Sequence, residues 1–447
     1  MGDKAMRFFI AVIALLGLLL GVFPGSYLAL ALGLAAAGFV VCSAGQPELA
    51  LYAAAFGIPV LSNSLGLGLA IAAAALWGFS RLRTGNYHLE PTGLDIPIAM
   101  LIALLVVSTV SSIDPAKSLP DLAISLAGIG LFFVTAYTIR TKAGLYRLVL
   151  VLICVAALVS LYGIYQFIMR VPPPESGWVD ASRNPFLQTR AFSTFGNPNV
   201  LANFLILSGP LALALASACR HAVKKILFFG VFGVLGVCML LTFSRGGWLG
   251  LLVATVLFSL AANRKLLLLM LIIAVVSLAI VPQVDILSAR LQNVGKDSSV
   301  SYRMVVWTEA LYIIRDFWPV GVGLGHRPFM QIYPAYMLDR NKKPFHTHNQ
   351  YLQLVVETGV LGLIIYGWII FRNLRQTLHL LREERDRLIV SVSAAVSASL
   401  AGLAVMGMTD NILYRPKVIL ILWVVLGIAA AAGMLQRRLA QGGEGRA

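Results

Sequence analysis

The chain has 447 residues, of which 59% are hydrophobic and only 12% are charged, and its mean hydropathy is +0.85. About a quarter of the residues of a soluble domain are charged, so this composition excludes an ordinary soluble protein. The formal net charge of +16 would suit a nucleic-acid partner, yet the positions of the basic residues argue against one.

Apolar segments long enough to cross a bilayer, which requires roughly 20 residues, recur from one end of the chain to the other. They predict an all-α polytopic membrane protein with about 12–14 transmembrane helices. The third segment is short and has Pro59 near its end, which is typical of a broken or re-entrant helix. In chain order, the predicted helices cover residues 7–23, 27–44, 48–61, 63–80, 94–112, 120–139, 144–169, 199–218, 223–242, 246–262, 265–282, 351–372, 388–409 and 416–435.

Basic residues gather on one side of the membrane if these helices alternate in direction. The positive-inside rule makes that side the cytoplasm. The sequence therefore predicts a bacterial cytoplasmic (inner) membrane protein with both termini in the cytoplasm and no nucleic-acid partner. The residues concerned are Lys4, Arg7, Arg81, Arg83, Arg140, Lys142, Arg147, Arg220, Lys224, Lys225, Arg264, Lys265, Arg372, Arg375, Arg382, Arg385, Arg387, Arg437 and Arg438.

The opposite side carries two longer segments, a loop at 170–198 and a stretch at 283–350 that is large enough to fold into a small extracytoplasmic helical cap. Residues 302–317 have apolar residues at helical spacing, which predicts an amphipathic helix near the membrane surface. The glycine-rich sequence at 321–326 predicts a turn with close backbone approach. The chain is thus divided into transmembrane residues 1–282, the cap at 283–350, and C-terminal helices with a cytoplasmic tail at 351–447.

Four arginines lie in segments predicted to be translocated, where arginine is disfavoured. Guanidinium groups offer forked donors that match phosphate oxygens, so arginines on one face predict an anion site. The alternative is a set of contacts to lipid head groups or structural ion pairs. The four are Arg190 in RAFSTFGNPN, Arg245 in the turn between the ninth and tenth helices, Arg303 at the start of the amphipathic helix, and Arg415 in the last outer turn.

Two histidines and an asparagine, His346, His348 and Asn349, come immediately before the twelfth predicted helix. Histidine is the side chain best suited to proton transfer near neutral pH, although a loop histidine without a catalytic role is the alternative. Asn349 is predicted to cap the helix, whose free N–H groups would favour a phosphate beside the site. We expect no metal site, because alternating residues of an extended chain point apart and no carboxylate pair lies nearby.

Three features together suggest a family. His348, Asn349, Gly359 and Gly362 fit the pattern H-[N/S/Q]-x9-G-x-x-[G/T/Y]. The stretch RAFSTFGNPNVLANF contains Arg190, and another stretch runs from Tyr302 and Arg303 through Trp307 to GVGLGH. With these features the chain resembles the O-antigen ligase and O-antigen polymerase family of bacterial membrane glycan transferases, over about residues 90–435 and most closely in the cap and its flanking helices.

The resemblance implies a metal-independent, inverting glycosyltransferase that acts on the outer face of the membrane without a cofactor. The donor would be a glycan on undecaprenyl pyrophosphate, and the acceptor a hydroxyl of a glycan or lipid. His348 would be the general base, while Arg190 and Arg245 would stabilise the leaving pyrophosphate. Residues expected to bind the pyrophosphate or glycan are Arg190, Arg245, Arg303, Asn349, His346 and Arg415, and the family pattern assigns no firm role to His346 or Arg415.

Ligase and polymerase differ only in the acceptor, and the ligase form of the histidine pattern favours a ligase. Transfer to protein hydroxyls is a related alternative. The competing class is a lipid-linked sugar flippase or permease. Ion-coupled transporters usually place carboxylates at the membrane midplane. Here the acidic residues concerned, Asp95, Asp121, Glu357 and Asp410, lie at the ends of predicted spans, which disfavours transport.

Overall fold

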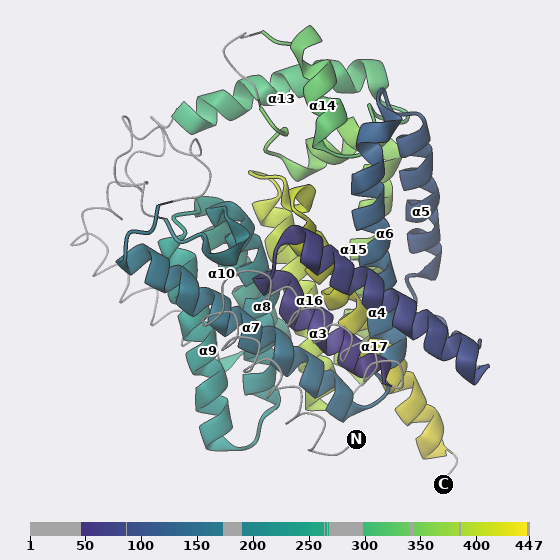
Figure 1. The fold of residues 1–447 in the computed structure, drawn as a ribbon. Helices are drawn as coiled ribbons and strands as arrows, with labels where there is room; N and C mark the ends of the chain where they lie inside the picture. Colours follow the sequence, from purple (N-terminus) through teal and green to yellow (C-terminus); the bar gives the residue numbers. More distant parts are fainter. Residues whose placement is uncertain are drawn as a thin grey trace, which may run out of the picture.

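In the computed structural model, every regular element among the described residues is helical (Figure 1). The described residues are 46–85, 87–172, 190–262, 264–265, 267, 298–338, 344–383 and 386–444. The predicted helices at 7–23 and 27–44 lie outside them, as does most of the predicted helix at 265–282.

Nine helices in the described part of the chain are long and apolar enough to cross a membrane. The prediction of an all-α polytopic membrane protein is therefore confirmed. These helices are α4 (Asn63–Thr84), α6 (Pro115–Thr138), α7 (Lys142–Ile168), α8 (Pro198–Ala218), α9 (Ala222–Leu241), α10 (Arg245–Ala262), α15 (Gln350–Glu383), α16 (Arg387–Met406) and α17 (Pro416–Glu444).

Two further apolar helices, α3 (Pro47–Val60) and α5 (Asp95–Val110), are shorter. At 1.5 Å per residue, the 14 residues of α3 span only about 21 Å, less than the hydrocarbon core of a bilayer. The predicted short element ending near Pro59 is therefore confirmed. Its last turn leaves carbonyls without helical partners, and the Pro59 carbonyl accepts hydrogen bonds from Thr194 Oγ1 at 2.6 Å and from Lys417 Nζ at 3.3 Å.

The centre of the bundle is formed by α8 and α17, whose apolar spans are buried almost throughout, whereas α4 and α9 lie at its edge. Small residues bring α10 and α16 close together. A Cβ atom at Gly250 of α10 would fall against the carbonyl of Gly402 in α16, and one at Gly402 would fall against the carbonyl of Gly250. Close backbone approach at small residues is a common way for membrane helices to pack.

A small helical layer covers one end of the bundle (Figure 1). It contains α13 (Ser298–Phe317), α14 (His326–Ile332) and the 3₁₀ turn η5 (Tyr333–Ala335). The predicted amphipathic helix at 302–317 is confirmed as α13, whose residues Val306, Ala310 and Ile313 are buried in a separate apolar cluster with α14 and α15. We call this layer, residues 298–338, the cap.

The glycine-rich loop between α13 and α14 inserts into α15. At Gly359 the helix is broken by a backbone φ of 70°, and on either side of the break the backbone bonds to the loop instead of to the helix. The Val322 amide donates to the Val356 carbonyl at 2.8 Å, and the Val360 amide donates to the Trp318 carbonyl at 2.9 Å. The predicted close approach of this loop is therefore confirmed, but the predicted continuous helix at 351–372 is broken and extends to Glu383.

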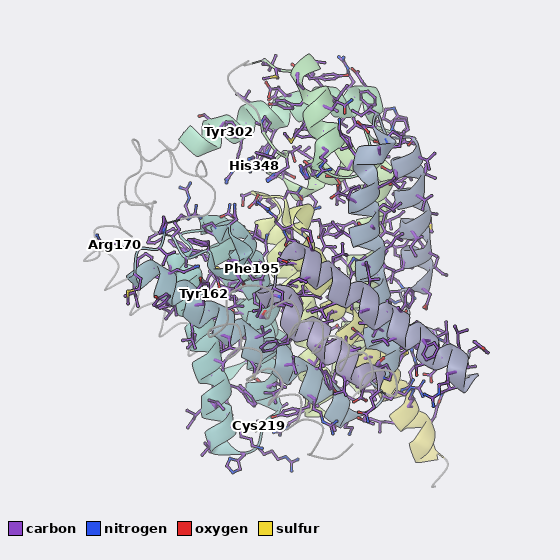
Figure 2. All side chains as sticks on the ribbon, in the orientation of Figure 1. Tyr162, Arg170, Phe195, Cys219, Tyr302 and His348 are labelled. Atoms are coloured by element: carbon purple, nitrogen blue, oxygen red, sulfur yellow. The ribbon has the colours of Figure 1, made fainter. Side chains whose placement is uncertain are left out.

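The two ends of the bundle differ in character. Figure 2 shows His348 close to the cap and Cys219 at the opposite end, and the C-terminal end of α17 also lies away from the cap. Basic residues predicted to be cytoplasmic form ion pairs at that far end: Lys142 with Asp386 at 2.6 Å, and Arg438 with Glu90 at 2.9 Å. The opposed placement agrees with the predicted topology, while the assignment of each end to a compartment stays a prediction.

Candidate functional site

The histidine loop before α15 has a tightly turned backbone. His348 has a φ of 52°, in the left-handed region that is uncommon for residues other than glycine. Its amide donates to Nδ1 of His346 at 3.1 Å, and the two imidazole centroids lie 4.3 Å apart. The prediction that these histidines point apart is therefore wrong, because it assumed an extended chain where the backbone turns.

Asn349 caps α15 as predicted. Its Oδ1 accepts hydrogen bonds from the amides of Tyr351 at 2.9 Å and Leu352 at 3.1 Å. Its Nδ2 donates to the Met408 carbonyl at 3.3 Å, which ties the loop to the turn between α16 and α17. Both polar ends of the Asn349 side chain are thus engaged by the protein itself.

Asp410, in that same turn, faces the catalytic candidate. One carboxylate oxygen lies 3.7 Å from Nδ1 of His348, whose side chain keeps about a third of its surface exposed. Burial by itself would raise the pKa of Asp410, but the neighbouring histidines and the charge of Arg303 hold it low, at about 2. The carboxylate is therefore ionised at neutral pH and can fix the ring of His348. Asp410 was not predicted to take part in the site, because its separation from the histidines carries no recognisable spacing.

His346 is buried, and its environment differs from that of His348. Burial lowers the pKa of His346 to about 3, and positive charge on His348 and Arg415 acts in the same direction. The ring is thus neutral at physiological pH, and because Nδ1 accepts a hydrogen bond we assign its proton to Nε2. A neutral, enclosed imidazole is suited to hold the loop in shape rather than to exchange protons with a substrate.

The loop is fastened on two further sides. Nε1 of Trp307, on α13, donates to the Thr347 carbonyl at 2.9 Å. The side-chain oxygen of Gln350 accepts from the amides of Ile412 and Leu413, both at 2.9 Å. The cap and the turn between α16 and α17 thus both bond to the residues that flank His348 and Asn349. The segment containing Trp307 was singled out from the sequence, whereas Gln350 was not.

Two of the predicted arginines lie near the histidines. The positive charge of Arg303 acts on Asp410, and that of Arg415 acts on His346 and on His326. Tyr302, the residue before Arg303, presents its ring to His348 with 5.9 Å between ring centroids, and Figure 2 places both near α13. The start of α13 therefore brings a cation and an aromatic ring to the site.

The other two arginines lie near the turn between α9 and α10: Arg245 is the first residue of α10, and Arg190, which precedes α8, bonds to the turn. Arg190 is 9% exposed; its Nε donates to the Thr242 carbonyl at 2.6 Å and its Nη2 to Oδ1 of Asn199 at 3.2 Å. Arg190 therefore supports the turn that leads into Arg245. The next residue, Gly246, packs so closely against Thr409 that a Cβ atom there would collide with its hydroxyl. This contact brings the start of α10 to the turn that carries Asp410.

Within the described residues, His346, His348 and Asp410 form a group that could hold a metal ion, since one ligand atom from each lies within 4.8 Å of the others. No carboxylate pair was expected near the histidines, and the structure brings one carboxylate, that of Asp410, to them. The charge of Arg303 acts on Asp410 and that of Arg415 acts on His346, and both would oppose a bound cation. The absence of a metal from the reaction stays a prediction.

Residues 230–367 match the family model described as O-antigen ligase. These residues are similar to an O-antigen ligase domain. The resemblance inferred from the sequence is thereby confirmed for this part. The matched part of the O-antigen ligase domain includes Arg245, Arg303 and the histidine loop, whereas Arg190, Asp410 and Arg415 lie outside it.

A weaker similarity links the chain to one curated protein of Rickettsia conorii, named "putative polysaccharide ligase". The two are 28% identical over 83 residues, which is 17% of this chain and 20% of the relative. The chain thus matches about a fifth of that relative's length. The activity of the whole protein and its substrates are therefore addressed as proposals.

Proposed function

We propose that the protein is a glycosyltransferase of the O-antigen ligase type, which moves a glycan from undecaprenyl pyrophosphate to an acceptor hydroxyl of a glycan or lipid. The observation that carries the proposal is the His348–Asp410 pair, surrounded by the charges of Arg303 and Arg415 at one end of a membrane bundle. A general base beside several cations suits the transfer of a group from a pyrophosphate. The O-antigen ligase match over residues 230–367 supports the same chemistry.

In the proposed reaction, His348 is the general base. Its Nδ1 faces Asp410, so Nε2 takes the proton of the acceptor hydroxyl. The hydroxyl oxygen attacks the anomeric carbon, and the bond from that carbon to the pyrophosphate oxygen breaks on the opposite face. The electron pair leaves with undecaprenyl pyrophosphate, and the configuration of the sugar inverts. Asp410 stabilises the imidazolium while it carries the proton.

The arginines receive distinct parts in this proposal. Arg245, Arg303 and Arg415 bind the pyrophosphate and stabilise its charge as it leaves. Arg190 contributes through the turn that it holds, and any direct contact with the pyrophosphate is made by donors beyond those bonded to Thr242 and Asn199. Asn349 and His346 shape the loop. The first amides of α15 are bonded to Asn349 and to the Gly407 carbonyl, so the N-terminus of α15 contributes only its partial positive charge beside the anion.

We further propose that the reaction needs neither metal nor cofactor and takes place on the outer face of the cytoplasmic membrane, where membrane lipids surround the donor. A polymerase would use the same residues and differ only in accepting a growing repeat-unit chain. A flippase would carry the same donor across the bilayer without breaking it. The placement of His348 at one end of the bundle (Figure 2), together with Asp410 and the charges of Arg303 and Arg415, favours transfer.

The test is transfer from purified undecaprenyl-pyrophosphate-linked glycan in detergent, with chelator present and a panel of hydroxyl acceptors. We expect His348→Ala to lower transfer by roughly 10²- to 10⁴-fold, the usual contribution of a general base. His379→Ala is the control, because His379 lies on α15 after the histidine loop, is exposed and pairs with Glu383. Transfer by His348→Ala at the wild-type rate would overturn the mechanism. Binding of the donor without transfer, combined with its translocation in proteoliposomes, would favour the flippase.

A further inference from the structure

Glu357 stands next to the break in α15 and joins two loops that are far apart in the sequence. One carboxylate oxygen accepts a hydrogen bond from the Gly325 amide, at the end of the glycine-rich loop, at 3.1 Å. The other accepts from Nε2 of Gln353, one helical turn earlier, at 2.7 Å. Both oxygens are therefore used to hold neighbouring parts of the protein.

Gln353 passes this connection to the histidine loop. Its Oε1 accepts from the Thr347 amide at 2.8 Å, while its Nε2 donates to Glu357. Thr347 is the residue between the two histidines, and its carbonyl accepts from Trp307. A continuous series of hydrogen bonds thus runs from the Gly325 amide, through Glu357 and Gln353, to the amide of Thr347, the residue before His348.

The surroundings leave little freedom for this series to rearrange. The backbone carbonyl of Glu357 accepts from Oγ of Ser108 on α5 at 2.6 Å. A Cβ atom at Gly321 would collide with the Glu357 carbonyl group, and one at Gly325 with the Asp121 carboxylate. The glycine-rich loop can therefore lie against Glu357 only because it lacks side chains at these two positions, both of which have positive φ values.

We propose that Glu357 is a positioning residue for glycan transfer: by accepting hydrogen bonds from Gly325 and Gln353 together, it sets the placement of His348 relative to the cap. The inference rests on the proposed function for its catalytic consequence. Arg303 and Tyr302 come from the cap, whereas Asp410 comes from the turn between α16 and α17. His348 must therefore keep its position relative to both the cap and this turn. A small displacement would lower the rate of transfer, because transfer depends on the alignment of the reacting atoms.

The polarity of the series allows a sharp test. In Glu357→Gln, the single side-chain oxygen can accept from Gln353 or from Gly325 but not from both, and its amide group faces a donor. In Gln353→Glu, two carboxylates face each other across one helical turn. In the double exchange, the carboxylate introduced at position 353 accepts from the Thr347 amide and from the side-chain amide introduced at position 357. The oxygen of that side-chain amide accepts from Gly325, so every hydrogen bond is restored with the same net charge.

We expect each single variant to lower kcat for transfer by roughly 10- to 100-fold, with the KM for the lipid-linked donor little changed. We expect the double variant to recover most of the wild-type kcat. Glu383→Gln is the control, because it makes the same substitution in an exposed part of the same helix. A residue that merely stabilised the fold would lower the melting temperature and the yield without lowering kcat per folded molecule.

A second readout separates this inference from the proposed function. Hydrogen–deuterium exchange of the peptide containing Thr347 reports whether its amide stays bonded, whether or not the protein transfers glycan. We expect faster exchange in Glu357→Gln and wild-type exchange in the double variant. If the wild type transfers no glycan but the exchange pattern holds, the proposed function fails and the positioning of the loop stands. Wild-type kcat in the single variants, or a double variant no better than them, would overturn the inference.

Discussion

Asp410 and His346 flank His348 and differ in charge at neutral pH. The pKa of Asp410 is held at about 2, so this carboxylate remains anionic beside the His348 ring. The pKa of His346 is lowered to about 3, so this ring stays neutral and adds no competing charge beside the base. In the proposed mechanism, His348 accepts a proton beside these two side chains, while the surrounding arginines bind the anion.

Asp410→Asn tests the role of the carboxylate. The amide keeps the shape of the side chain but removes the charge that stabilises the imidazolium. We expect kcat for transfer to fall by roughly 10²- to 10⁴-fold, as for the corresponding change in hydrolytic triads, with little change in donor KM. Asp316→Asn is the control, since Asp316 is exposed in the cap and pairs with Arg315. Equal kcat values for Asp410→Asn and the wild type would remove Asp410 from the mechanism.

His346 predicts a pH effect on stability. Its folded-state pKa of about 3 lies below the ordinary value of 6.5, so at intermediate pH the unfolded chain binds a proton that the native protein does not. The wild type therefore loses stability as the pH falls through this window, by roughly 2 kcal/mol at pH 5, and His346→Gln does not lose this share. The melting temperature of His346→Gln relative to that of the wild type should therefore be higher at pH 5 than at pH 7.5. An unchanged difference between the two proteins would contradict the assignment.

At the scale of elements, the break in α15 lets the glycine-rich loop bond to the helix backbone. Glu357 and Gln353 then connect this loop to the histidine loop. Gly359 combines a φ of 70° with a ψ of −177°, and a Cβ atom there would collide with the Pro319 carbonyl. The released Val356 carbonyl and Val360 amide bond to the loop instead. The two glycines of the family pattern thus have different tasks, because Gly362 leaves room for the side chain of Thr358.

Gly359→Ala should therefore destabilise the protein. This combination of φ and ψ is essentially restricted to glycine and costs roughly 1–3 kcal/mol for a residue with a Cβ, and the collision adds to it. Gly367→Ala, in the same helix, has no atom within 4 Å of the added Cβ and should be neutral or stabilising by roughly 0.5–1 kcal/mol. Thermal unfolding in detergent compares the two. Similar melting temperatures for both variants would mean that the break at Gly359 is not required.

How far the sequence could anticipate these elements depends on the range of the interactions. The amphipathic α13 and the capping of the α15 N-terminus by Asn349 were predictable, because their signals lie within a few turns of chain. The break at Gly359 was not, because it arises from backbone bonds to residues 318–322, which the α15 pattern does not encode. The same holds for Asp410 and Glu357, which acquire their roles only when distant segments meet at the histidine loop.

At the scale of the whole molecule, the two ends are chemically distinct. The cap end gathers the histidines and the charges of Arg303 and Arg415, while the far end carries ion-paired basic turns and the C-terminal end of α17. The helix α6 connects them: Lys117 near its start donates to Gln331 of the cap at 2.9 Å, and its other end lies beside the Lys142–Asp386 pair. Its 24 residues correspond to about 36 Å, enough to cross the hydrocarbon core.

The positive-inside rule then predicts that the cap faces outward. Two single-cysteine proteins test it in intact cells with a membrane-impermeant maleimide: one retains only Cys219, at the far end, and the other carries only Leu338→Cys, at an exposed cap position. We expect Leu338→Cys to be labelled directly and Cys219 only after the cytoplasmic membrane is permeabilised. The reverse pattern would place the histidine loop in the cytoplasm. A lipid-linked donor would then have to be used before it is translocated, and the basic turns would be the translocated ones.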